Sequence, residues 1–75
     1  MPSTVQLTAI IEREGDLFSA LCPELDIASA GESVEDARKN LVEALELFFE
    51  SAEPEEVGRR LATEVYVTHL ELAIG

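Results

Sequence analysis

Apolar and polar positions follow their most regular pattern in the middle of the chain, between residues 33 and 52. Apolar side chains recur there at steps of three and four residues, which places them on one face of an α-helix. Ser33 stands at the N-cap position with Asp36 three residues later, and Pro54 disfavours helical backbone at the residue before it. We therefore predict a helix over Ser33–Ser51. Its apolar face consists of Val34, Ala37, Leu41, Ala44, Leu45, Phe48 and Ala52.

The residues before this helix alternate with the period of two that is typical of β-strands. Thr4–Arg13 is rich in β-branched side chains, and Leu17–Cys22 resumes the same alternation after a turn at Glu14–Asp16. These features predict a β-hairpin whose three-residue turn uses the conformational freedom of glycine. Pro23 has no N–H to donate to a ladder, so it ends the second strand. A third short strand is predicted over Leu25–Ala30.

The chain after the helix consists of a polar connection and a second β-like run. Ala52–Arg60 is mostly polar, with room for one helical turn at Glu55–Val57, and Thr63–Ile74 is again rich in β-branched residues. We predict a single α+β domain over residues 1–75 with the order β-β-β-α-β, in which one helix packs on one face of an antiparallel sheet. Its predicted core consists of Val5, Leu7, Ile11, Leu21, Leu41, Leu45, Phe48 and Val67.

The charge of the chain narrows the classes of partner. Sixteen acidic residues against five basic ones give a net charge of −11, which repels nucleic acid. An apolar fraction of 47% is too high for a disordered acidic tail. One cysteine excludes an intrachain disulfide framework. Without a secretory signal pattern or an apolar run of about 18 residues, we expect a cytoplasmic protein that binds neither membrane nor nucleic acid by itself.

Few residues of the chain carry a pattern typical of a chemical site. Three potential metal ligands occupy every second position of one segment and would share one side of an extended chain: Cys22, Glu24 and Asp26. The intervening Pro23 favours a structural turn instead. His69 is the only histidine and has no nucleophile near it in the sequence. We therefore predict no catalytic residue, no metal site and no cofactor.

Two features of the predicted helix lie outside its apolar face. Asn40 has low helical propensity, which favours a hydrogen bond to a neighbouring loop or strand end over a contact with a partner. Glu43, Glu46, Glu50 and Glu53 follow steps of three and four residues and form an acidic ridge. Such a ridge is either a solvated face or a surface complementary to a basic partner.

Large apolar side chains beside the ridge favour an interaction surface. Leu47 and Phe49 lie off the apolar stripe, so both are expected to be exposed in a monomer. A domain of this length also has a thin core and unpaired sheet edges, which predicts a homodimer or a homotetramer. The candidate partner-binding residues are Glu43, Glu46, Leu47, Phe49 and Glu50.

The run from Gly15 to Glu50 resembles the HicB-type antitoxins of bacterial and archaeal toxin–antitoxin pairs. The resemblance implies a degenerate ribonuclease-H-like β-β-β-α-β fold, together with a partner of the HicA type, a small basic toxin that cleaves messenger RNA. Many family members add a DNA-binding segment at the C-terminus, whereas this chain ends at Gly75, so we expect the HicB-like domain alone. The matching residues are Gly15, Phe18, Ala20, Pro23, Glu24, Leu25, Gly31, Ser33, Glu35, Ala37, Asn40, Glu43 and Ala44.

Ribonuclease-H-type catalysis needs several carboxylates that converge on two metal ions, one of them usually at the centre of the first strand. That centre, Leu7–Ile11, carries no acidic residue, so we expect that the protein is not an enzyme. Two functions remain open at this point. The first is an antitoxin-like inhibitor that binds and neutralises a HicA-type toxin. The alternative is a solitary homo-oligomeric HicB-like protein with a different binding or structural role.

Overall fold

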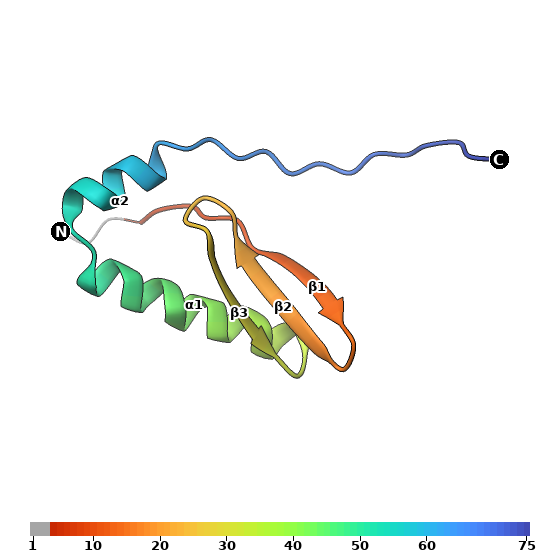
Figure 1. Cartoon of the computed structure of the whole chain (residues 1–75), viewed down its shortest axis with the longest axis horizontal. Helices are drawn as coiled ribbons and strands as arrows, with labels where there is room; N and C mark the ends of the chain where they lie inside the picture. Colours follow the sequence, from red (N-terminus) through yellow and green to blue (C-terminus); the bar gives the residue numbers. More distant parts are fainter. Residues whose placement is uncertain (1–3) are drawn as a thin grey trace.

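Three antiparallel strands and two helices follow one another along the chain (Figure 1). The computed structural model describes residues 4–75, so the first three residues of the predicted domain lie outside the described residues. The strands form one sheet with the order β1-β2-β3, and α1 lies across one face of it. The predicted α+β class is therefore confirmed. The elements are β1 (Ile10–Glu14), β2 (Leu17–Cys22), β3 (Ile27–Gly31), α1 (Val34–Ser51) and α2 (Pro54–Leu61).

The predicted hairpin of the first two strands is confirmed, with a tighter turn than expected. Glu14 pairs with Leu17, so only Gly15 and Asp16 form the loop. Gly15 has a φ of 64°, a left-handed conformation that glycine adopts without steric cost. β1 begins at Ile10 rather than Thr4, which leaves residues 4–9 outside the ladder.

The connection between β2 and β3 is the turn that Pro23 predicts. The ladder stops at the pair Cys22 and Ile27, and the four residues between them form the turn. Asp26 has a φ of 55°, a left-handed conformation that aspartate tolerates better than most residues. The third strand therefore begins two residues later than predicted. Leu25 lies in the turn instead and is only 1% exposed.

Hydrogen bonds of two polar side chains fix the beginning of α1 where the sequence predicts it. The Ser33 hydroxyl accepts a hydrogen bond from the backbone N–H of Asp36 at 3.0 Å, which caps the helix. The side-chain amide of Asn40 donates to the carbonyl oxygen of Ala30 at 2.7 Å. This bond ties the end of β3 to the second turn of α1, as predicted for Asn40.

The core between sheet and helix is small. Leu41 is buried as predicted, and Leu7, Ile11, Leu45 and Phe48 pack around the core while remaining partly exposed. The fully buried apolar residues are Ala20, Cys22, Leu25, Ala37 and Leu41.

Three residues of the predicted core do not belong to it. Val5 precedes β1, and Val67 follows α2 outside the sheet, so they are 49% and 53% exposed. Leu21 lies between the buried residues Ala20 and Cys22, and side chains alternate along a strand. Leu21 therefore faces away from α1.

A second helix replaces most of the predicted polar connection. α2 has eight residues, whereas the sequence predicts a single helical turn at Glu55–Val57. Pro54 occupies its first turn together with Glu55 and Glu56, while Arg59 and Arg60 occupy its last turn. This arrangement suits both the missing N–H of proline and the helix dipole.

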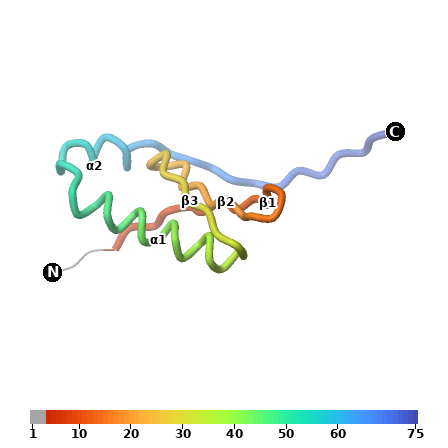
Figure 2. The backbone as a smooth tube through the Cα atoms, turned by 60° about the horizontal axis from the view of Figure 1, so that its bottom comes forward, coloured from red at the N-terminus to blue at the C-terminus, as the bar shows by residue number. Residues whose placement is uncertain are grey.

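The predicted fourth strand is wrong. Residues 63–75, here called the C-terminal arm, are extended but belong to no strand of the described chain. Figures 1 and 2 show the arm leaving α2 and running past the end of the β1–β2 hairpin. The composition of the arm favours extended backbone, but a strand also needs a neighbouring edge with which its N–H and C=O groups can pair. The order in the structure is therefore β-β-β-α-α followed by an extended arm.

Candidate interaction surface

The acidic ridge predicted on the long helix is exposed along its whole length. Glu43, Glu46, Glu50 and Glu53 are all solvent-accessible. Over residues 4–75 none of these carboxylates makes an ion pair, and the ion pair that does form joins Arg60 to Glu56 at 3.2 Å. The ridge therefore presents uncompensated negative charge along the C-terminal half of α1.

A shallow groove of about 530 Å³ runs beside this ridge. Leu7, from the segment before β1, forms one wall, and α1 forms the other with Val42, Leu45 and Phe49. Two ridge residues, Glu46 and Glu50, complete the α1 side of the groove. Apolar side chains thus lie directly against carboxylates in a single depression, here called the acidic-rimmed groove.

The structure unites three of the five predicted partner-binding residues. Glu46, Phe49 and Glu50 line the acidic-rimmed groove, whereas Glu43 and Leu47 do not. Leu47 is exposed as predicted, at 64%. Phe49 differs from the prediction, because it is half-buried, packs next to the core and meets the Phe48 ring edge-on at 5.4 Å between centroids. Leu7 was missed because it comes from a segment far from α1 in the sequence, whereas Val42 lies on α1 itself and carried no signal that it borders a groove.

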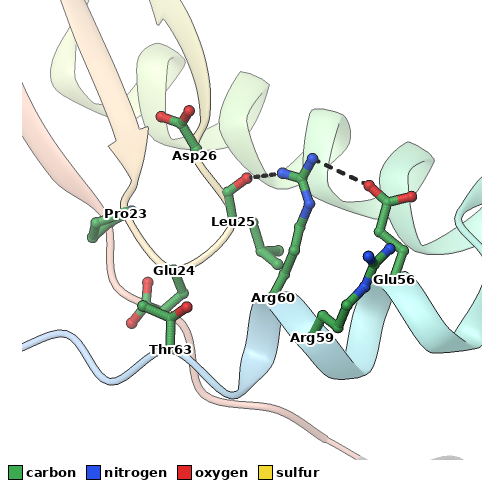
Figure 3. A pocket seen from close by; sticks show the side chains of 8 residues that line it. All are labelled: Pro23, Glu24, Leu25, Asp26, Glu56, Arg59, Arg60 and Thr63. Carbon is green, nitrogen blue, oxygen red and sulfur yellow. Dashed lines mark hydrogen bonds and ion pairs between the residues drawn. The ribbon is translucent and has the colours of Figure 1, made fainter.

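A second depression lies where α2 meets the turn between β2 and β3 (Figure 3). Arg60 dominates it. Its guanidinium group donates a hydrogen bond to the carbonyl oxygen of Leu25, pairs with Glu56 and lies over the Phe48 ring at 5.4 Å from the centroid. One side chain therefore joins α2, α1 and the turn, which is a structural role. The pair with Glu56 has the i, i+4 spacing of a helix, but the sequence offered no signal for the contacts with Leu25 and Phe48, because both are set by the position of α2.

Glu24 accepts hydrogen bonds that fix the segment before β1. Thr8 donates to its carboxylate from the backbone N–H at 3.1 Å and from the hydroxyl at 2.6 Å. Burial raises the pKa of Glu24, but the hydrogen bonds from Thr8 outweigh it, so the pKa lies below its usual value. Cys22 lies 3.5 Å from the same carboxylate, and the pKa of its thiol is raised, mainly by burial.

The residues weighed as metal ligands do not converge. Asp26 is exposed and points away from Glu24 in Figure 3. Within residues 4–75, no group of three His, Cys, Asp or Glu side chains is placed to hold a metal ion. His69 lies on the exposed C-terminal arm. The part of the chain that the structure describes contains no helix long and apolar enough to cross a membrane.

Comparison of the chain with protein-family models, with curated proteins and with solved structures gave no match. The resemblance to HicB-type antitoxins therefore rests on the sequence between Gly15 and Glu50 and stays a prediction.

Proposed function

We propose that the chain is an antitoxin-like interaction module that binds and neutralises a small basic, RNA-cleaving toxin of the HicA type, and that its fold is of the degenerate ribonuclease-H-like, HicB-like kind. The observation that carries this proposal is the acidic-rimmed groove, in which Leu45 and Phe49 lie against Glu46 and Glu50. A basic partner with an apolar side chain flanked by Lys or Arg fits both properties of the groove.

The two components of the groove have different physical roles. The unpaired carboxylates attract a basic protein over a distance of about 8 Å at physiological salt, which raises the association rate and selects against acidic partners. The apolar wall contributes affinity, because large side chains buried at the centre of an interface supply most of the binding free energy. The module would act by covering the RNA-binding surface of the toxin, without a chemical step of its own.

The direct test is an RNA-cleavage assay with a purified HicA-type toxin. We expect the wild-type chain to abolish cleavage at stoichiometric amounts. The triple variant Glu43→Lys, Glu46→Lys and Glu50→Lys should slow association at least about tenfold at low salt. A matched control, Glu14→Lys, Asp16→Lys and Glu32→Lys, makes the same charge change at exposed positions near the hairpin end and should slow it much less. An unchanged cleavage rate with excess wild-type chain would refute the proposal.

The alternative is a solitary homo-oligomeric protein with a different binding or structural role. The exposed apolar side chains of the C-terminal arm, including Leu70, Leu72 and Ile74, favour self-association in either case. The two functions differ in whether the acidic-rimmed groove binds a basic toxin. If excess wild-type chain leaves RNA cleavage unchanged, the alternative is favoured. If the triple Lys variant and the control both inhibit the toxin equally fast, the ridge is only a solvated face.

A further inference from the structure

The chain exposes more surface than a compact protein of its size. Its accessible surface is 6291 Å² at a mass of 8.2 kDa. A compact monomer of this mass exposes about 4,500 Å², a difference of about 1,800 Å². The radius of gyration is 14.6 Å, whereas about 11 Å is typical for this length. A chain with five buried core residues, two of them alanines, has little burial to offset so much exposed surface.

The C-terminal arm accounts for much of this excess. Beyond the N–H of Thr63, which donates to Arg60, no backbone hydrogen bond of the described chain involves the arm. Its large apolar side chains are among the most exposed of residues 4–75, with Leu70 at 83% and Ile74 at 92%. The alternation places Leu70, Leu72 and Ile74 on one side of the extended backbone. The arm thus has the pattern of a strand whose partner is missing.

The chain's own sheet cannot pair with the apolar end of the arm, because the position of Thr63 fixes the register of the arm along its own β1 edge. The arm starts at Thr63, which lies beside Glu24, and Thr8 is bonded to the same Glu24. From Thr8, the edge of the sheet continues for only six residues before the hairpin turns after Glu14. If the arm folded back along this edge, its residue His69 would lie level with the hairpin turn. The three apolar residues beyond it would overhang the sheet, as Figures 1 and 2 show for the arm itself.

The outer edge of β1 is an unpaired strand edge of the kind that the arm needs as a neighbour. β1 lies at one end of the sheet order, so its outer N–H and C=O groups are unpaired. α1 packs mainly over β3 and β2 and leaves this edge open. On the face opposite α1, the paired residues Ile10, Leu21 and Ala28 form an apolar stripe that leads to the edge.

We propose that two copies of the chain exchange their C-terminal arms. The arm of each protomer adds as a strand to the outer edge of β1 of the second copy. The arm side that carries Leu70, Leu72 and Ile74 then lies on the sheet face opposite α1 and extends the apolar stripe beyond Ile10. The contact is reciprocal, so a two-fold axis closes the assembly as a dimer. This inference goes beyond the proposed function and does not depend on a basic partner.

Surface area favours this occupant, and charge disfavours the acidic-rimmed groove as the place where the arm binds. A standard stable interface removes about 800 Å² from each partner, which is less than half of the excess that one chain exposes. The arm carries Glu64 and Glu71, so its acidic character disfavours the acidic-rimmed groove. That groove stays available to a basic protein while the arm lies along β1. The net charge of −11 on each copy opposes pairing, but salt screens charges more than about 8 Å apart.

Sedimentation equilibrium across the micromolar range tests the exchange. We expect the wild-type chain to sediment at twice its mass of 8.2 kDa. The arm variant Leu70→Ser, Leu72→Ser and Ile74→Ser should weaken dimerisation at least about 100-fold. The control variant Thr68→Ser, His69→Ser and Glu71→Ser changes three other exposed positions of the same arm and should stay within about threefold of the wild type. Both variants leave the buried core intact, so helical circular dichroism should be retained.

Amide hydrogen exchange distinguishes the remaining outcomes. In the wild-type dimer the amides around residues 70–74 that face β1 should exchange slowly, and in the arm variant they should exchange freely. A monomeric wild type with a protected arm would overturn the proposal, because the arm would then lie on its own sheet. A monomer with an unprotected arm would overturn it in favour of a different protein partner. A dimer that the arm variant leaves unchanged would also overturn it.

Discussion

The hairpin with α1 and the C-terminal arm have similar apolar patterns but opposite surroundings. In the first region the inward-facing apolar side chains of the sheet meet those of α1, and Ala20, Cys22 and Leu41 are buried as a result. In the arm the same alternation meets none, and Tyr66 is 84% exposed. The comparison teaches that alternation selects an extended backbone with one apolar side. Whether that backbone becomes a strand depends on an available edge, which the hairpin provides for itself and the arm does not.

The largest expected effect contrasts the buried helix face with the arm. Leu41→Ala should lower the free energy of unfolding by about 2–5 kcal/mol, because Leu41 is 2% exposed in a core with few other large residues. Leu72→Ala removes the same atoms from a side chain that is 77% exposed. Measured by urea unfolding at a concentration where the chain is monomeric, it should cost less than about 0.5 kcal/mol. Similar losses for the two variants would mean that the arm packs within its own protomer.

The next effect concerns the close approach of the sheet to α1. A Cβ atom added at Gly31 would overlap the backbone N of Ala37 and lie 2.7 Å from the backbone carbon of Asp36. Gly31→Ala should therefore destabilise the fold by about 1–3 kcal/mol.

Gly58→Ala is the matched control for this prediction. Gly58 lies within α2 and has no atom within 4 Å of an added Cβ. The substitution should stabilise the fold by about 0.5–1 kcal/mol through helix propensity alone. Thermal unfolding of both variants tests the pair, and a neutral Gly31→Ala would show that the sheet and helix separate easily at this point.

The smallest expected effect tests how firmly the segment before β1 is held. The lowered pKa of Glu24 means that its ionised form stabilises the fold above the unfolded pKa of about 4.3. This contribution is lost as the pH falls through the lower folded-state pKa. Thr8→Val removes the hydroxyl donor, so it should cost about 1 kcal/mol at pH 7 and reduce the loss of stability between pH 5 and pH 3.

The exposed Thr68 of the arm provides the control. Thr68→Val makes the same change where the described chain shows no hydrogen bond from the hydroxyl, and it should leave the pH dependence unaltered. Urea unfolding at several pH values measures both variants. An identical acid response of wild type and Thr8→Val would exclude the Thr8 hydroxyl as a cause of the lowered pKa of Glu24.

The sequence determined the elements whose signals are local. The cap at Ser33, the turn at Gly15 and the break at Pro23 all follow from short-range backbone and side-chain preferences. For Asn40 the low helical propensity indicated a hydrogen bond outside the helix, and the packing of β3 against α1 supplies its acceptor. The acidic ridge was also predictable, because exposed residues on a helix follow its period. Only the tertiary structure decided which of these residues share a groove, since Leu7 meets Phe49 through the path of the chain.

The features that the sequence could not determine all depend on contacts between distant segments. Leu25 is buried in a turn because the turn folds under α2, where Arg60 binds its carbonyl group. Leu21 faces away from α1 because the register of β2 places Ala20 and Cys22 inward, and a shift of one residue would reverse all three. The sequence of the C-terminal arm predicts a strand, but in the described structure the arm pairs with no other strand. Composition sets the preference for extended backbone, but only a neighbouring edge supplies the hydrogen bonds that make a strand.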